Sequence, residues 1–367
     1  MKIPFVDLKK QYLSIKDEID SAVNSVIMDS AFVGGKYVNS FENNFADYIG
    51  IKCCIGVGNG TDALYISLKA LGIEEGDEVI TAANSFIATS EAITMTGARA
   101  IFVDCNDKTY NMDINKIEGV VSGKTKAIIP VHLYGQPANM SEIMGIAKKN
   151  SLFVIEDAAQ AHGAQYRNEN IGSFGDCACF SFFPGKNLGA YGDAGAIVTD
   201  DKELARKVRM LANHGRVGKY NHEFEGINSR LDGLQAAILD VKLKHLDKWT
   251  QRRRAIANMY DEGLKEAVII PVFLPDVRHV YHLYVVRIKD RDKAKMLLEE
   301  RGVSTGIHYP IPLPFLEAYK YLGHTPADFP VSYSLKDDIL SLPIHGDMED
   351  EQVEYVIEQV KDVAKKI

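Results

Sequence analysis

The chain has 367 residues, of which 46% are hydrophobic and 25% charged, and its formal net charge is −8. This length allows about two domains and a large buried core, and the composition is that of an ordinary soluble globular protein. The negative net charge argues against a nucleic-acid partner. We recognise neither a signal peptide nor an apolar run long enough to span a membrane, so we expect a cytoplasmic protein with no membrane contact.

Strand and helix patterns alternate between residues 51 and 200. The strand candidates in chain order are KCCIGVG, DEVITA, RAIFVD, AIIPVH and LFVIED. Runs that are apolar on both faces and are joined by helices predict an α/β fold with a mostly parallel sheet covered on both sides. Ligands of such folds bind at the carboxyl ends of the strands.

The pattern changes after residue 200. Long helical patterns, the strand-like HLYVVRI and a closing helix predict a smaller α+β C-terminal domain. We expect a large domain over residues 1–245, including an N-terminal helical segment, and a small domain over 246–367. The three arginines at 252–254 lie within a helical pattern, and we interpret them as part of a solvated face.

The five cysteines indicate neither a disulfide framework nor a metal site. Their number is odd and no C-x-x-C pair occurs. Cys177 and Cys179 stand two apart in an apolar run, which predicts small buried residues on one face of a strand.

The stretch GVGNGTDAL at 56–64 places three glycines between a predicted strand and a predicted helix, where backbone N–H groups can bind an anion. A dinucleotide-binding fingerprint is disfavoured because the next strand does not end in an acid. A P-loop aligned on Lys186 fails at two positions. A phosphate site remains, with a plain turn capped by Thr61 or Asp62 as the alternative.

The stretch LFVIEDAAQAHGA ends a buried strand in Glu156 and Asp157. A carboxylate in that position carries a desolvation cost, so it should have a cationic partner, and a protonated heterocyclic nitrogen would serve. The alternative is a helix N-cap with Gln160 as its capping partner.

Lys186 lies in the apolar, glycine-rich stretch FSFFPGKNLGAYGDAGAIVTD. Loss of hydration would lower its pKa, which prepares a lysine for Schiff-base chemistry; the alternative is an ordinary surface lysine. A phosphate site, a strand-end carboxylate and an isolated lysine together predict pyridoxal 5′-phosphate (PLP) as the cofactor. Phe86 is the candidate for stacking on its ring.

At this point the motifs closely resemble those of the DegT/DnrJ/EryC1/StrS family of nucleotide-sugar aminotransferases. The resemblance extends from VDLKKQY near the N-terminus to about residue 346. It rests on GNGTDAL, NSFIATSEAI, VHLYGQPANM, EDAAQAHGA, SFFPGKNLGAYGDAGAIVT, GINSRLDGLQAA and SLPIHGD. It implies a type I aminotransferase fold with a seven-stranded sheet, and PLP that becomes pyridoxamine phosphate during turnover. It also implies a homodimer whose active sites contain residues of both subunits.

The resemblance assigns roles around the cofactor. Lys186 would bind its aldehyde and Asp157 would pair with its pyridinium nitrogen. Gln160 would lie beside its 3-hydroxyl group and Phe86 beside its ring. The phosphate would be bound by a set of donors that includes one residue of the neighbouring subunit: Gly60, Thr61, Ser181 and the neighbour's Asn228.

His308 and Tyr309 would line the substrate pocket, with a structural loop as the alternative. The form PGKNLGAYGDAGA resembles the branch that transfers an amino group from L-glutamate to C3 of a dTDP-3-keto-6-deoxyhexose. The products would be a dTDP-3-amino-3,6-dideoxyhexose and 2-oxoglutarate. The alternative is a C4 aminotransferase acting on a dTDP- or UDP-4-keto-6-deoxy sugar. Related dehydratases carry histidine instead of lysine, so Lys186 argues against dehydration.

Overall fold

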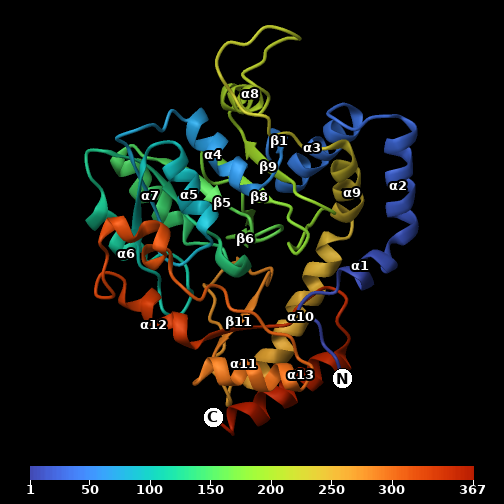
Figure 1. The fold of residues 1–367 in the computed structure, drawn as a ribbon, viewed down its shortest axis with the longest axis vertical. Coiled ribbons are helices and arrows are strands. Elements are labelled where there is room, and N and C mark those ends of the chain that lie inside the picture. The colour runs from blue at the N-terminus through green and yellow to red at the C-terminus, as the bar shows by residue number, and fades with distance from the viewer.

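The computed structural model describes residues 1–367 and is built around a seven-stranded sheet (Figure 1). The strands lie in the order β1-β9-β8-β5-β4-β2-β3. β9 is antiparallel to both of its neighbours, and the strands from β8 to β3 are parallel. Their bounds are β1 Cys53–Val57, β2 Glu78–Ala82, β3 Arg99–Val103, β4 Thr125–Ile129, β5 Phe153–Asp157, β8 Cys177–Ser181 and β9 Gly195–Thr199. The predicted α/β class and the five predicted strands are confirmed.

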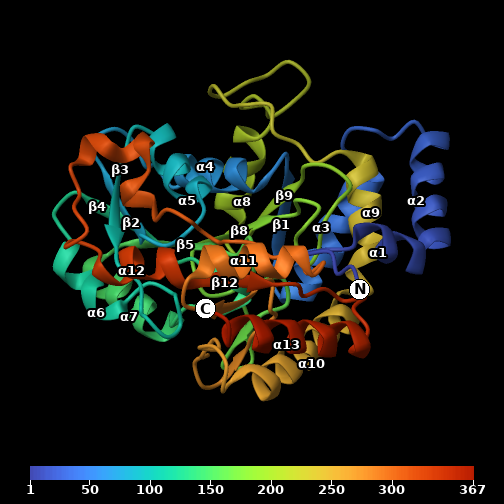
Figure 2. The same ribbon diagram turned by 60° about the horizontal axis from the view of Figure 1, so that its bottom comes forward.

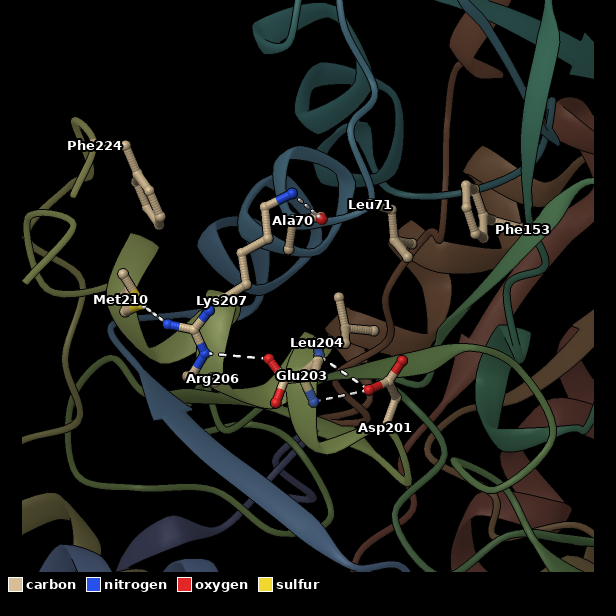
Figure 3. Close-up of a pocket in the computed structure, with 10 residues that line it drawn as sticks. All are labelled: Ala70, Leu71, Phe153, Asp201, Glu203, Leu204, Arg206, Lys207, Met210 and Phe224. Carbon is tan, nitrogen blue, oxygen red and sulfur yellow. Dashed lines mark hydrogen bonds and ion pairs between the residues drawn. The ribbon is translucent and has the colours of Figure 1, made fainter. Parts of the chain in front are cut away.

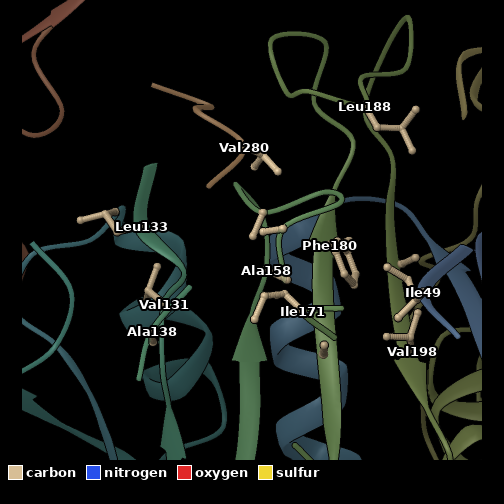
Figure 4. Close-up of a cluster of buried hydrophobic side chains, with 14 of the residues drawn as sticks. Ile49, Val131, Leu133, Ala138, Ala158, Ile171, Phe180, Leu188, Val198 and Val280 are labelled. Carbon is tan, nitrogen blue, oxygen red and sulfur yellow. The ribbon is translucent and has the colours of Figure 1, made fainter. Parts of the chain in front are cut away.

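Helices cover both faces of this sheet (Figure 2). One face packs against α4 (Gly60–Ala70), α5 (Ile87–Met95) and α8 (Lys202–Leu211); the other packs against α3 (Lys36–Ile49), α6 (Ile114–Ile117), α7 (Met140–Asn150) and α9 (Gly233–Leu243). Successive strand residues alternate between the two cores, as the pleat requires. Figure 4 shows part of the second core, where Phe180 and Val198 of neighbouring strands lie beside Ile49 of α3.

The remaining elements lie around this body. The N-terminal residues form α1 (Leu8–Ser14) and α2 (Lys16–Met28), and both chain termini lie at the lower end of the view in Figure 1. A three-stranded sheet contains β6 (Gln165–Tyr166), β7 (Glu169–Asn170) and β10 (Val277–Arg278). The C-terminal part contains the two-stranded sheet of β11 (Tyr284–Arg287) and β12 (Ile339–Leu342), with α10 (Leu246–Leu264), α11 (Arg291–Glu300), α12 (Pro330–Asp338) and α13 (Asp350–Ala364).

Some C-terminal side chains belong to the core of the large sheet. Val280, Leu283 and Leu335 are buried in the same cluster as the residues of α3 and β8. The domain boundary between residues 245 and 246 therefore stays a prediction, although α10 does begin at Leu246. None of the helices combines the length and the apolar character that crossing a bilayer would need.

Two sequence interpretations have clear outcomes. Cys177 and Cys179 are buried in β8 and face the same core, as predicted. The interpretation of residues 252–254 as a solvated face is wrong for Arg253, which is 6% exposed. Its guanidinium donates hydrogen bonds to the carbonyl oxygens of Tyr281 and Ile344, so it joins α10 to the C-terminal segments. Helical spacing places Arg253 on the buried face of α10, together with Trp249, Ile256 and Tyr260.

Candidate active site

A cavity of about 500 Å³ lies at the carboxyl ends of the parallel strands. This is the edge at which the fold predicts a ligand, and the volume suits a cofactor or small substrate. The cavity is lined by eight of the ten residues predicted for the site, namely Gly60, Thr61, Phe86, Asp157, Gln160, Ser181, Lys186 and Tyr309. They come from five separate parts of the chain, so the fold brings together what the sequence separates.

The N-terminus of α4 forms one wall of the cavity. The side chain of Asn59 caps the helix by accepting a hydrogen bond from Asp62 N at 2.8 Å. The amides of Gly60 and Thr61 occupy the first two helical positions, which have no acceptor within a helix. A Cβ on Gly60 would lie 2.7 Å from the Cβ of Ser181, so only glycine lets the Ser181 side chain approach this helix end. The result is an anion site of backbone amides and one hydroxyl group.

Glu156 and Asp157 point to opposite sides of β5 because successive strand residues alternate. Glu156 is fully buried and accepts hydrogen bonds from the amides of Gly172, Phe174 and Gly175. It also faces His132, whose Nε2 lies 3.0 Å from Glu156 Oε2. Every one of these partners is part of the protein, so Glu156 has a structural role.

Asp157 faces the cavity instead. Thr89 donates a hydrogen bond to its Oδ2 at 2.7 Å, and Ala159 N donates to its Oδ1 at 3.2 Å. Because the hydroxyl hydrogen of Thr89 is used, Ser85 Oγ at 2.9 Å must donate to Thr89 Oγ1. Asp157 is 5% exposed and forms no ion pair within the protein, so it lacks the cationic partner that burial calls for.

Lys186 follows β8 in a loop and reaches the same cavity. Burial lowers the pKa of Lys186 to about 8, while the charge of Asp157 acts in the opposite direction. An amine with that pKa is in part unprotonated near neutral pH, as a nucleophile or base must be.

Because of Lys186, we expect the free energy of unfolding of the coenzyme-free protein to depend on pH. The pKa of Lys186 is about 8 when folded and 10.5 when unfolded. The unfolded state therefore binds more protons between these values, and stability rises with pH across this window. Lys186→Met should be more stable than the wild type at pH 7, by about 2 kcal/mol given the partial exposure of the side chain. Urea unfolding at pH 7 and pH 10 measures the difference, which should shrink at the higher pH; an unchanged difference would contradict the lowered pKa of Lys186.

Gln160 connects the cavity to two tyrosines. Its Oε1 accepts a hydrogen bond from Tyr134 N at 2.6 Å, and its Nε2 donates to the hydroxyl of Tyr309 at 3.1 Å. The ring of Phe86 is 52% exposed and lies 5.7 Å from that of Tyr309, at an interplanar angle of 41°. The two rings form an aromatic border that suits a flat ligand.

His308 and Asn228 lie outside the cavity lining. His308 packs against Phe5, and its Nδ1 lies 2.8 Å from Ser341 Oγ. Asn228 is exposed at the base of the long loop after α8 and pairs with Asn213. The predicted roles of both residues stay predictions. Sequence reasoning missed Thr89 and Ser85, although their helical spacing from each other within NSFIATSEAI is a usable signal.

A separate hollow lies between α4 and α8 (Figure 3). It includes Phe153 at the start of β5, so it is at the opposite edge of the sheet from the cavity. Lys207 donates a hydrogen bond there to the carbonyl oxygen of Ala70, and Asp201 caps α8. These polar groups already have partners in the protein, and the hollow offers no comparable set of free donors and reactive groups.

The cavity fits PLP on the chemistry of its donors. The amides at the start of α4 and the hydroxyl of Ser181 match a phosphate. Asp157 would complete its missing ion pair with the pyridinium nitrogen, and Lys186 is the amine in reach of the same space. These three features match the three groups that PLP presents.

Comparisons with known proteins agree with this fit. The model of the DegT/DnrJ/EryC1/StrS aminotransferase family matches residues 13–361. A "dTDP-3-amino-3,6-dideoxy-alpha-D-galactopyranose transaminase" of Aneurinibacillus thermoaerophilus is 48% identical over 98% of both chains. A "pleiotropic regulatory protein" of Geobacillus stearothermophilus is 45% identical, also over 98% of both. The solved structure of Streptomyces venezuelae DesV in complex with a ketimine intermediate is 41% identical, with a TM-score of 0.98 over 100% of this chain and 99% of that one.

The family match and the similar proteins extend over nearly the whole chain. Aminotransferases of this family depend on PLP, and solved relatives include forms with its amino derivative bound. The expected type I aminotransferase fold is confirmed by the structural neighbours. This chain belongs to the DegT/DnrJ/EryC1/StrS aminotransferase family and is a PLP-dependent aminotransferase.

Proposed function

We propose that this enzyme transfers the amino group of L-glutamate to C3 of a dTDP-3-keto-6-deoxyhexose. The observation that carries the aminotransferase chemistry is the convergence of Lys186, Asp157 and the N-terminus of α4 on one cavity. The sugar and the position of amination are supported by the printed name of the 48% identical relative and by the PGKNLGAYGDAGA stretch. The products are a dTDP-3-amino-3,6-dideoxyhexose and 2-oxoglutarate.

The residues of the cavity have distinct roles in binding. The amides of Gly60 and Thr61 and the hydroxyl of Ser181 bind the phosphate of PLP. Asp157 keeps a proton on the ring nitrogen, and Thr89 holds the carboxylate in place through its 2.7 Å hydrogen bond. Gln160 lies beside the 3-hydroxyl group, and Phe86 covers part of the ring. When bound, PLP supplies the electron sink that lets a carbon–hydrogen bond next to the amine ionise.

Lys186 has two roles, as the attachment point of the coenzyme and as the proton carrier. Once released from the coenzyme, its Nζ would remove the proton from the α-carbon of L-glutamate. The same Nζ would then deliver a proton to the coenzyme carbon to which Lys186 had been attached. With the keto sugar, Nζ moves the proton in the reverse direction. Its lowered pKa suits both duties, because the amine loses and gains a proton near neutral pH.

The proposed enzyme is a homodimer in which each active site contains residues of both subunits. The loop between α8 and α9 projects from the body of the subunit (Figure 1), and Asn228 is exposed at its base. In this arrangement Asn228 reaches the coenzyme phosphate of the neighbouring subunit, and His308 and Tyr309 lie near the sugar. A large domain over 1–245, a small domain over 246–367 and a cytoplasmic location complete the proposal.

A substrate panel tests this function. The enzyme loaded with pyridoxamine phosphate is mixed with four sugars: the 3-keto and 4-keto 6-deoxyhexoses, each linked to dTDP or UDP. Conversion of pyridoxamine phosphate to PLP, monitored by the visible absorption of PLP, should be fastest with the dTDP-linked 3-keto sugar. Preference for a 4-keto sugar would replace the proposal by the C4 alternative. Tight binding without turnover of any sugar would favour a regulatory role, the function named for the 45% identical relative.

A further inference from the structure

The segment that follows Lys186 is attached to α9 by two side chains. Lys242 Nζ donates a hydrogen bond to the carbonyl oxygen of Gly189 at 2.6 Å. Gln235 accepts a hydrogen bond from Tyr191 N at 2.8 Å and donates one to Tyr191 O at 3.3 Å. Gln235 and Lys242 are seven residues apart, which places them on the same side of the helix two turns apart. One side of α9 therefore holds the backbone at Gly189 and Tyr191.

Lys242 is an unusual lysine. It is 1% exposed, and no carboxylate lies within ion-pairing distance of its Nζ. Its ammonium group also lies 4.3 Å from the centre of the Tyr191 ring. Burial lowers the pKa of Lys242 to about 8, with Asp347 acting in the opposite direction from further away. A buried cation is costly, so its contacts with Gly189 and Tyr191 are the features that offset the cost.

The hydrogen bond from Lys242 to Gly189 affects the position of Lys186 because backbone hydrogen bonds join the two arms of the loop that contains both Lys186 and Gly189. Lys186 N donates to Phe183 O, and Ala190 N donates to Phe182 O, both at 2.8 Å. A Cβ on Gly189 would lie 2.4 Å from the carbonyl oxygen of Pro184, so the two arms of the loop are in contact. A shift of Gly189 therefore moves the backbone that carries Lys186.

We propose that Lys242 is a positioning residue for Lys186. By holding the carbonyl of Gly189, it fixes the loop so that the Lys186 amine faces Asp157 and the phosphate-binding amides across the cavity. Gln235 supports the same loop at Tyr191. The inference rests on the proposed role of Lys186 as the attachment point of the coenzyme, and it assigns a function to α9, a helix that contributes no residue to the cavity lining.

The first experiment is amide hydrogen exchange on the full-length, coenzyme-free protein. Lys242→Met keeps the buried stem and removes the donor, which leaves the Gly189 carbonyl unpaired. Exchange in the peptide that covers residues 183–194 should become about tenfold faster, because the lost bond has a charged donor. Lys244→Met, at an exposed neighbouring lysine that caps the C-terminus of α9, is the matched control and should leave this peptide unchanged.

Two measurements with PLP separate positioning from general stability. The dissociation constant for PLP should rise about tenfold in Lys242→Met, and the midpoint of the pH titration of its visible absorbance should move. Lys242→Arg, which keeps a donor, should restore part of both. If Lys242→Met does not fold, Gln235→Leu replaces it, since Gln235 is partly exposed and its loss frees Tyr191 alone.

The outcomes distinguish this inference from the proposed function. If borohydride fails to fix PLP to Lys186 in the wild type, the proposed role of Lys186 is wrong. If the wild type is labelled there but the variants leave exchange, PLP affinity and titration midpoint unchanged, Lys242 has no positioning role. Faster exchange throughout the protein, rather than in residues 183–194, would also overturn it.

Discussion

Replacing Lys186 by alanine should abolish amino transfer while leaving the fold intact. The variant loses the attachment point of the coenzyme and the group that moves the proton, so we expect kcat to fall by roughly 10⁴-fold or more. The cavity retains the phosphate-binding amides and Asp157, so PLP should still bind without a covalent bond. A spectrum before and after addition of L-glutamate measures the first half-reaction.

The visible band of the lysine-bound coenzyme should be present in the wild type and bleach with glutamate. In Lys186→Ala the band should be altered and should not respond on the same timescale. Lys202→Ala, an exposed lysine at the start of α8, serves as the matched control and should behave as the wild type does. Normal turnover by Lys186→Ala would refute the proposed mechanism.

Replacing Asp157 by asparagine should have the second largest effect. Asparagine can keep the hydrogen bond with Thr89 but carries no charge, so the ring nitrogen of PLP loses the group that keeps it protonated. Charge stabilisation of this kind is worth about 10²–10³ in rate, and we expect kcat/KM to fall by about 10³-fold. Initial rates with L-glutamate at saturating PLP measure it.

The neighbouring carboxylate provides the control for Asp157. Glu156 faces away from the cavity and is paired with His132 and three backbone amides. Glu156→Gln should therefore lower the stability of the protein, with a rate per folded molecule close to that of the wild type. Equal losses of rate in the two variants would mean that strand geometry, rather than the charge of Asp157, is what matters.

Much of the fold and the reactive centre could be predicted from the sequence. The five predicted strands, from KCCIGVG to LFVIED, are present because short runs apolar on both faces can be buried only in a covered sheet. Lys186 and Asp157 stand out locally, one as an isolated cation among apolar and glycine residues and the other as a strand-end carboxylate. The resemblance to a known family then assigned roles that composition and spacing could not.

The tertiary structure decided which groups are partners across long stretches of chain. Thr89 reaches Asp157 because α5 and β5 meet at one edge of the sheet, 68 residues apart in sequence. The run of three arginines at 252–254 suggested a solvated face, yet the C-terminal segments cover Arg253.

The burial of Lys242 is a second case that the local sequence does not indicate. Its ammonium group is buried because the loop at Gly189 packs against it and accepts its hydrogen bond. Local sequence determines which elements form and which side chains are chemically distinctive. The environment of a long polar side chain depends on what packs against it, and that information is absent from its neighbours in the chain.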